Sequence, residues 1–228
     1  MADAGEQTVC ILFFVKYPEA GNVKTRLSEA LDDGSAARLY RFFVTDILAM
    51  LRKTGYPVMV CYTPTDREKA FRAWLGDQYH YMPQRGGNLG ERLQHGFAEA
   101  FARGYDGAVA IGSDSPDLPA RFIHEAFAEL AHDSMVIGPA IDGGYYLIGF
   151  TRHTFSPSAF EGIEWSTPTV FAETLRRLQD SSKEGDIYIL PAWKDVDTLE
   201  DLQALYHRNR ESLFAASDTM RYITEHVL

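Results

Sequence analysis

The sequence has no long hydrophobic run and no excess of positive charge, and each shortage excludes a class of protein. No apolar stretch approaches the ~20 residues that a membrane-spanning helix needs, and the N-terminus, MADAGEQ, is polar and acidic. We therefore expect a cytoplasmic protein without a membrane span. Lys and Arg number 22 against 32 Asp and Glu, so the net charge is −10. Because binding along a nucleic-acid backbone neutralises many phosphates, no nucleic-acid partner is expected.

Cysteine and histidine are also too sparse or too scattered for the motifs in which they are ligands. The two cysteines, Cys10 and Cys61, lie in separate strand-like runs and form no C-x-x-C pair, so buried, reduced thiols are expected. None of the seven histidines has a partner at metal-ligand spacing. This argues against a zinc site.

The length and composition suit one sizeable core, with 228 residues of which 46% are hydrophobic. No repeat, low-complexity tract or Pro/Gly/Ser-rich linker divides the chain. We predict one domain over residues 1–228, with a C-terminal helical segment at about 211–228. Whether the last helix packs on its own domain or against a partner stays open, and so does the formation of a homo-oligomer.

Strand-like apolar runs alternate with helix-like periodic ones, which predicts an α/β fold with a mainly parallel sheet and helices on both faces. Between the first two strands, Leu39, Phe43, Ile47 and Met50 recur at helical spacing and are interpreted as core. The predicted strands are 9–15, 58–62, 79–82, 108–111, 135–137, 145–150 and 187–190. Further helices are predicted at 67–75, 89–103, 121–131, 169–178 and 199–207, and within 213–227.

The loop after the first predicted strand, YPEAGNVKTRL, gathers positive charge. A Walker loop, G-x-x-x-x-G-K-S/T, is excluded because proline stands where its first glycine should be. Lys16, Lys24 and Arg26 nevertheless bracket a turn that contains Gly21, at the strand end where open α/β sheets bind ligands. An anionic ligand is therefore predicted here.

The strand 108–111 runs into GSDSPDLP, which presents two aspartates at the same edge of the sheet. Asp117 lies nearer the following helix, so we interpret it as a turn and capping residue. Asp114 leaves the strand first, so a functional carboxylate is the preferred interpretation. A serine-hydrolase elbow is excluded because the G-x-S-x-G spacing is not present.

A second acidic cluster occurs in WKDVDTLEDL. Thr198 and Asp201 have the spacing of a capping box that begins a helix. Asp195 and Asp197 then lie just before this helix, free to point toward the strand ends. Together with Asp114 they have the composition of a Mg²⁺ or Mn²⁺ site, because hard cations take carboxylate oxygens. The alternative for Asp197 is that it only complements the helix dipole.

The segment GPAIDGGYYLIGF places Asp142, Gly143 and Gly144 between two strand-like runs. Asp-Gly by itself is typical of a tight hairpin turn. The alternative is that the glycines let the backbone approach a ligand that Asp142 faces. Both interpretations stay open.

Two further loops carry weaker signals. In RGGNLGERL the glycines, including Gly87 and Gly90, do not have the G-x-G-x-x-G spacing of a dinucleotide site, so a substrate-lining loop near Arg92 stays open. In WSTPTVF, Thr167 is expected to cap a helix whose first turn contains proline. Trp165 is then either core or the wall of an acceptor pocket.

These segments, in this order, resemble a known family. KYPEAGNVKTRL, NLGERL, IGSDSPDLP, GPAIDGGYYLIG, IEWSTPTV and DVDTLEDL each match a segment of the glycosyltransferase-A-type (GT-A) nucleotide-diphospho-sugar transferases, some of them linked to arsenosugar biosynthesis. That family is similar in turn to molybdenum-cofactor and phospholactate guanylyltransferases and to sugar nucleotidyltransferases. The chain lacks the Leu-Ala-Ala-Gly-x-Gly-x-Arg pattern of the last group, whereas phospholactate guanylyltransferases carry a Lys-Ser-Arg-Leu-like version of VKTRL.

The resemblance implies a Rossmann-like GT-A fold that binds a nucleotide or nucleotide sugar and a small-molecule acceptor. It implies Mg²⁺ or Mn²⁺ on Asp114 and Asp197, with Asp195 as a further candidate, and Lys24 and Arg26 on the phosphates. Asp142 is the candidate base. The predicted nucleotide-binding residues are Lys16, Gly21, Lys24, Arg26, Gly87, Gly90, Arg92 and Ser113, and the predicted acceptor pocket is Gly143, Gly144, Tyr145 and Trp165.

Three functions follow from these expectations. The first is metal-dependent glycosyl transfer from a nucleotide-diphosphate sugar. The second is nucleotidyl transfer from a nucleoside triphosphate to a phosphorylated acceptor, with release of pyrophosphate. The third is nucleotide binding without catalysis, which is less favoured because aspartates without a metal would repel the phosphates.

Overall fold

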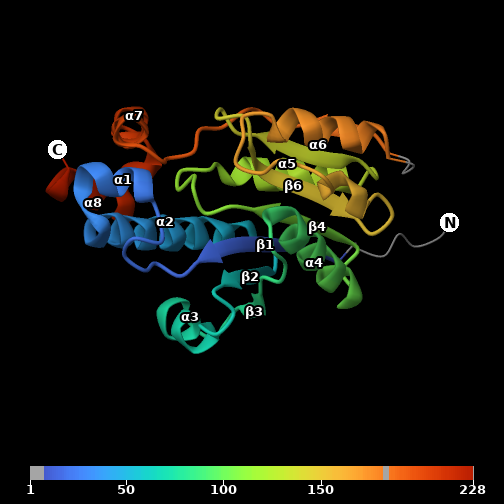
Figure 1. Ribbon diagram of the computed structural model, residues 1–228, viewed down its shortest axis with the longest axis horizontal. Helices are drawn as coiled ribbons and strands as arrows, with labels where there is room; N and C mark the ends of the chain where they lie inside the picture. Colours follow the sequence, from blue (N-terminus) through green and yellow to red (C-terminus); the bar gives the residue numbers. More distant parts are fainter. Residues whose placement is uncertain (1–7, 182–184, 228) are drawn as a thin grey trace.

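The computed structural model describes residues 8–181 and 185–227, so the polar segment MADAGEQ lies outside the described residues. A seven-stranded sheet with the order β3-β2-β1-β4-β6-β5-β7 forms the centre of the molecule (Figure 1). All seven predicted strands are present. They are β1 (Val9–Lys16), β2 (Val58–Thr63), β3 (His80–Pro83), β4 (Gly107–Ile111), β5 (Met135–Pro139), β6 (Tyr145–Thr151) and β7 (Ile187–Ile189).

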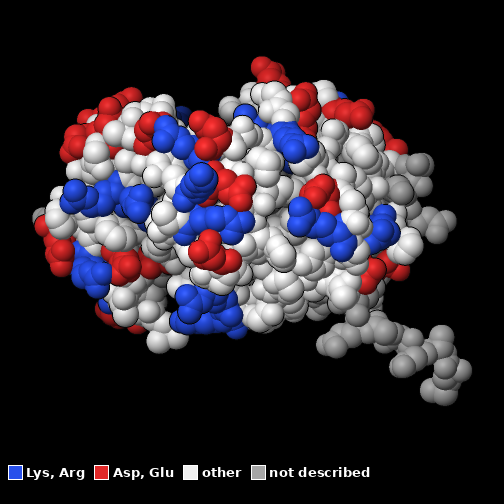
Figure 2. All heavy atoms as spheres, turned by 90° about the horizontal axis from the view of Figure 1, so that it is seen from below, with Lys and Arg blue, Asp and Glu red and all other residues white. Residues whose placement is uncertain are grey.

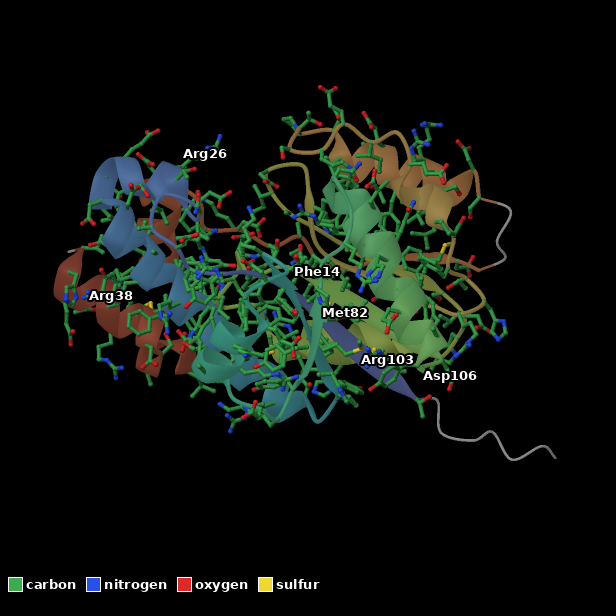
Figure 3. All side chains as sticks on the ribbon, turned by 60° about the horizontal axis from the view of Figure 1, so that its bottom comes forward. Phe14, Arg26, Arg38, Met82, Arg103 and Asp106 are labelled. Carbon is green, nitrogen blue, oxygen red and sulfur yellow. The ribbon has the colours of Figure 1, made fainter. Side chains whose placement is uncertain are left out.

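The first strand shows why the sheet is covered on both faces. Its apolar side chains alternate, so Ile11 and Phe13 pack into one core while Leu12 and Phe14 pack into the other. The first core contains residues of α2 (Asp33–Thr54), α5 (Ala120–Leu130), α7 (Leu199–Asn209) and α8 (Asp218–His226). The second contains residues of α4 (Leu89–Ala102), the 3₁₀ helix η1 (Pro157–Phe160) and α6 (Val170–Gln179). Phe14 and Met82 lie close together in this second core (Figure 3). The predicted α/β fold class with helices on both faces is confirmed.

Strand direction decides which loops meet. β1 pairs in parallel with β2 and β4, and β5 pairs in parallel with β7. Only β6 runs the other way, pairing antiparallel with β4 and β5. The loops that follow β1, β4, β5 and β7 therefore all emerge at the same carboxyl edge.

The helices agree with the predicted ones except in two places. A short helix, α1, which begins at Thr25, was not predicted, because the segment carries no side-chain cap. The 3₁₀ helix η1 was not predicted either. The helices are α1 (Thr25–Leu31), α2 (Asp33–Thr54), α3 (Glu68–Leu75), α4 (Leu89–Ala102), α5 (Ala120–Leu130), η1 (Pro157–Phe160), α6 (Val170–Gln179), α7 (Leu199–Asn209), η2 (Leu213–Ala216) and α8 (Asp218–His226).

One predicted helix cap is wrong and another is confirmed. The N-cap of α6 is Thr169, whereas Thr167 donates its hydroxyl to the carbonyl of Glu164, because the turn before the helix is longer than expected. At α7, Thr198 and Asp201 form the reciprocal capping box. Asp195 and Asp197 therefore precede the helix, as predicted.

The last helix packs on its own chain. Asp46 of α2 accepts hydrogen bonds from the backbone N–H groups of Asp218 (3.3 Å) and Thr219 (2.8 Å) and so caps α8 across the tertiary structure. The helices α1, α7 and α8 gather at one end of the molecule (Figure 1).

The surface carries charges of both signs. Figure 2 shows Lys and Arg interspersed with Asp and Glu on the face that it displays. Within residues 8–181 and 185–227, no helix has the length and apolar character needed to cross a membrane.

Candidate active site

Loops that are far apart in the sequence converge at the carboxyl edge of the sheet. The backbone N–H of Val196 donates to the carbonyl of Asp114 at 2.9 Å, which joins the loop after β7 to the loop after β4. The N–H of Ile141 in turn donates to the carbonyl of Trp193 at 3.1 Å, which joins the β5–β6 turn to the loop after β7. The predicted acidic segments are thereby brought together.

Lys24 lies between the two aspartates that were predicted to bind a metal. Its Nζ is 2.8 Å from Asp197 Oδ1 and also forms an ion pair with Asp114 Oδ1. The Lys24 side chain is only 3% exposed, whereas those of Asp114 and Asp197 are 49% and 39% exposed. The ammonium therefore lies on the buried side of the cluster, and the two carboxylates lie on its solvent-exposed side. That Lys24 binds phosphate stays a prediction.

The local backbone directs Lys24 inward. The residue has φ 49° and ψ 44°, a left-handed conformation that L-residues rarely adopt, immediately before α1. Its Nζ lies 5.6 Å from the centroid of the Phe43 ring, on α2. Burial by itself would lower the pKa of Lys24, but attraction to Asp114 and Asp197 outweighs it, and the pKa is raised. The ammonium is therefore charged.

Asp195 faces a different partner from Asp197. Its carboxylate accepts a hydrogen bond from the hydroxyl of Ser115 at 2.5 Å. Burial, and after it the neighbouring charge of Asp114, raise the pKa of Asp195 to about 7. Asp195 thus lies beside the cluster but outside the ion pairs of Lys24, and its assignment as a metal ligand stays a prediction.

Ser113 belongs to a buried chain of hydrogen bonds that sequence reasoning missed. Its Oγ is 2.7 Å from the hydroxyl of Tyr40, which also accepts from the backbone N–H of Lys16 at 3.1 Å. Burial, and after it the charge of Asp114, raise the pKa of Tyr40 to about 12. Tyr40 directly follows Leu39 of the apolar stripe of α2. The feature of the sequence that could have indicated its role is a side chain with a hydroxyl group next to this core-facing stripe. These hydrogen bonds connect α2 to the end of β1 and to the loop after β4.

Asp142 closes the β5–β6 turn. Its Oδ1 accepts the backbone N–H of Gly144 at 3.0 Å, and the residue is exposed. Gly143 has φ 94°, and a Cβ there would lie 2.1 Å from the carbonyl oxygen of Pro168. The hairpin interpretation is therefore correct for the backbone, and Gly143 is required by a close packing contact. A catalytic role for Asp142 stays a prediction.

The predicted acceptor-pocket aromatics meet across this packing contact. The rings of Tyr145 and Trp165 are 6.3 Å apart, edge to face. Trp165 also packs against Gly90, where an added Cβ would lie 2.8 Å from its ring and 2.7 Å from the carbonyl oxygen of Phe160. The structure thus brings Tyr145, Trp165 and Gly90 together, and the glycine makes room for the tryptophan.

The glycine-rich loop before α4 is closed by its own residues. The N–H of Gly87 donates to Glu91 at 2.7 Å, and Asn88 caps the helix by accepting from the N–H of Glu91 at 2.9 Å. Arg92 donates from Nε to the carbonyl of Gly86 at 3.2 Å. Nucleotide contacts from Gly87 and Arg92 stay predictions, because in this structure both groups have partners within the loop.

Asp117 is structural, although not as predicted. The N-cap of α5 is Pro119, so the expectation that Asp117 caps this helix is wrong. Its side chain, 2% exposed, accepts instead from Arg208 at 2.7 and 2.9 Å, from Asn209 at 2.6 Å and from the indole of Trp193 at 3.2 Å. This network holds α7 against the loop that carries Asp114.

Two predicted phosphate ligands lie at the surface of the same edge. Arg26 is exposed on α1 and projects outward (Figure 3), and Lys16 is exposed at the end of β1. Within the part of the chain that the structure describes, neither side chain has an ion-pair partner. Gly21, with φ 79°, lies exposed in the loop between them. These cations are therefore free to meet an anion.

The donor set suits a divalent cation only if a ligand completes it. Asp114 and Asp197 supply two carboxylates whose Oδ2 atoms make no hydrogen bond among the described residues. Over those residues, no group of three or more His, Cys, Asp or Glu could hold a metal ion. Magnesium is usually held by one or two carboxylates together with substrate phosphates. The residues fit such a shared site.

Comparison with known proteins decides the family. Residues 46–167 match the family described as "Uncharacterized protein conserved in bacteria (DUF2064)". A solved structure from Desulfovibrio desulfuricans G20, described as a "putative nucleotide-diphospho-sugar transferase", is 44% identical, with a TM-score of 0.92 over 96% of this chain and 95% of that one. The chain belongs to the DUF2064 family. No curated protein matches it.

More distant solved structures share the fold of this DUF2064 protein. The Rv0371c complex with manganese from Mycobacterium tuberculosis H37Rv is 14% identical, with a TM-score of 0.53 over 88% of this chain and 98% of that one. CMP:2-keto-3-deoxy-manno-octonic acid synthetase complexed with CTP is 13% identical, with a TM-score of 0.55 over 89% and 99%. The predicted resemblance and GT-A-type fold are confirmed, and the 44% identical relative supports the predicted enzyme class, a transferase.

Proposed function

We propose that this DUF2064 protein transfers a sugar from a nucleotide-diphosphate donor to a small-molecule acceptor, with a divalent cation bound at Asp114 and Asp197. The observation that carries the proposal is the acidic pair at the carboxyl edge of the sheet, with the exposed cations Lys16 at the end of β1 and Arg26 on α1. Ligands of open α/β sheets bind at this edge. The 44% identical relative from Desulfovibrio desulfuricans G20, described as a nucleotide-diphospho-sugar transferase of this kind, supports the same substrate class.

The carboxylates and the cations would have different roles in binding the donor. When bound, Mg²⁺ or Mn²⁺ would neutralise charge that develops on the departing nucleoside diphosphate. Arg26 would hold the phosphates through its planar guanidinium, and Lys16 would add a point charge. Lys24 would keep Asp114 and Asp197 close together by ion pairing with both. None of these roles requires a covalent intermediate.

Asp142 is the proposed base for the acceptor hydroxyl. It is exposed at the same edge, and the N–H of Gly144 donates to Oδ1, while Oδ2 makes no hydrogen bond among the described residues. Tyr145 and Trp165 lie behind this turn and would form part of the acceptor wall. An Asp142→Asn variant is expected to bind the donor normally and to lose turnover.

Nucleotidyl transfer is the second candidate, because the CTP-bound synthetase has the same fold. In this chain the reaction would use the same carboxylates and cations. Thermal-shift screening of nucleotides and nucleotide sugars with Mg²⁺ or Mn²⁺ would identify the donor. A ligand at 100 times its dissociation constant stabilises the folded state by about 2.7 kcal/mol. The leaving product then separates the candidates. Free nucleoside diphosphate supports sugar transfer, whereas inorganic pyrophosphate would refute it in favour of nucleotidyl transfer.

A further inference from the structure

The ion pairs of Lys24 occupy the inner side of the proposed metal site. Asp114 and Asp197 each direct Oδ1 at the lysine ammonium. Their Oδ2 atoms make no hydrogen bond among the described residues, and the two side chains are 49% and 39% exposed. A cation that approaches from solvent therefore meets two carboxylates whose charge one ammonium already balances in part.

The Lys24 ammonium also has little freedom to move away from the two carboxylates. The Lys24 side chain is 3% exposed, the Phe43 ring lies 5.6 Å from its Nζ, and the segment that carries it contains two buried apolar residues, Val23 and Leu27. An ammonium that swung away would leave two carboxylates close together without a counter-charge. In the protein without bound ligand, the Lys24 ammonium thus already supplies one positive charge at the site.

We propose that Lys24 excludes a free divalent cation from the Asp114/Asp197 pair, so that the metal enters only together with nucleotide phosphates. The inference rests on the proposed function, and it adds an order of binding to it. Lys24 is a positioning residue here, because it acts on the metal through the two carboxylates.

The net charge of Asp114, Asp197 and Lys24 explains why the metal would bind only together with the nucleotide. Two carboxylates and one ammonium carry one net negative charge, and a divalent cation alone would turn this into one net positive charge beside a buried lysine. At separations near 4 Å, such like charges repel strongly even at an effective dielectric of 20. The phosphates of a nucleotide bring the missing negative charge and supply the further oxygens that the site lacks. Metal and nucleotide therefore stabilise each other's binding.

Lysine variants test this with binding measurements that need no acceptor. Lys24→Met removes the ammonium, and Lys24→Gln removes the charge but keeps a hydrogen-bond donor. Lys194→Met is the matched control, because Lys194 lies on the loop that carries Asp197 but pairs with Asp201, at 3.0 Å. Mn²⁺ affinity without nucleotide is measured from the electron paramagnetic resonance signal of the free ion. Calorimetry measures the affinity of ADP, CDP, GDP and UDP, each with and without Mn²⁺.

We expect the wild type and Lys194→Met to bind Mn²⁺ weakly alone and to bind at least one nucleoside diphosphate more tightly with Mn²⁺ present. Lys24→Met and Lys24→Gln should bind Mn²⁺ alone at least about tenfold more tightly. Wild-type Mn²⁺ affinity in whichever Lys24 variant folds, as judged by circular dichroism, overturns the inference and leaves the proposed metal use intact. If Mn²⁺ improves no nucleotide affinity in the wild type, the metal part of the proposed function fails, and the inference with it.

Discussion

Lys24 and Asp197 are 173 positions apart in the sequence, yet Lys24 Nζ lies 2.8 Å from Asp197 Oδ1. The contact links the loop after β1 to the loop before α7, at the edge where the parallel strands end. Together with the ion pair to Asp114, it makes one side chain the common partner of both proposed metal ligands.

The metal proposal predicts that the two aspartates are separately necessary. In Asp114→Asn or Asp197→Asn, the Mn²⁺-dependent part of nucleoside diphosphate affinity should fall at least about tenfold, because one anionic ligand is lost. Calorimetry with and without Mn²⁺ measures this. Asp77→Asn, at a side chain that is 85% exposed and outside the cluster, is the control. Unchanged affinity in both site variants would remove the metal from the proposal.

Asp195 predicts a pH dependence of stability. Burial, and next the charge of Asp114, raise its pKa to about 7 from a usual value near 3.8. A raised pKa means that the folded state binds this proton more tightly than the unfolded state. Its contribution is therefore fully present below about pH 4 and is lost as the pH rises through 7.

Asp195→Asn cannot ionise and should escape this loss. Relative to the wild type, it should gain roughly 1–3 kcal/mol in free energy of unfolding between pH 4.5 and pH 8. Urea denaturation at the two pH values measures the change. A difference between the two proteins that is the same at both values would contradict the predicted shift.

The Asp117 network predicts a strong dependence of stability on one buried carboxylate. Asp117→Ala leaves Arg208 and Asn209 without their shared acceptor and should lower the free energy of unfolding by about 3 kcal/mol. Arg210→Ala removes a surface pair with Glu211, at 3.5 Å, and should cost less than about 0.5 kcal/mol. Urea denaturation compares them. Equal losses would mean that the network does not stabilise the docking of α7.

A comparison of Gly143 with Gly104 separates the effect of a steric contact on stability from the effect of backbone strain. Gly143 and Gly104 have nearly the same φ, 94° and 96°, but an added Cβ meets the Pro168 carbonyl at 2.1 Å only at Gly143. Gly104→Ala should cost about 1–2 kcal/mol from the left-handed backbone alone. Gly143→Ala should cost about 1–3 kcal/mol more. Thermal unfolding of the two variants is the measurement, and similar melting temperatures would contradict the close packing.

Arg26 is the exposed arginine expected to bind phosphate. Arg26→Ala should weaken nucleoside diphosphate binding about three- to tenfold, more at low salt than at high salt, because a charge-assisted contact is lost. Arg38, on α2 and apart from Arg26 in Figure 3, supplies the control Arg38→Ala with the same change in net charge. Calorimetry at two salt concentrations measures both. Equal effects of the two substitutions would indicate only a long-range charge effect.

Local patterns were sufficient for much of the fold. The continuous apolar run of β1, the apolar stripe of α2 and the Thr198–Asp201 capping box are properties of neighbouring residues. Strands, helices and the start of α7 could therefore be predicted from the sequence. The acidic loops were likewise predicted to meet, because parallel strands place their carboxyl ends at one edge. The short helix α1 escaped because it has neither a side-chain cap nor enough length for a clear period.

The tertiary structure alone decided what each of these side chains faces. Charge and position in the sequence predicted that Lys24 binds phosphate, which stays a prediction, but did not indicate that Lys24 pairs with Asp114 and Asp197. They predicted that Asp117 caps a helix, whereas packing pairs Asp117 with Arg208. Both partnerships span 90 or more residues. No local period or spacing encodes such contacts. They arise because a buried charge requires an opposite charge within reach, and only the assembled sheet determines which one that is.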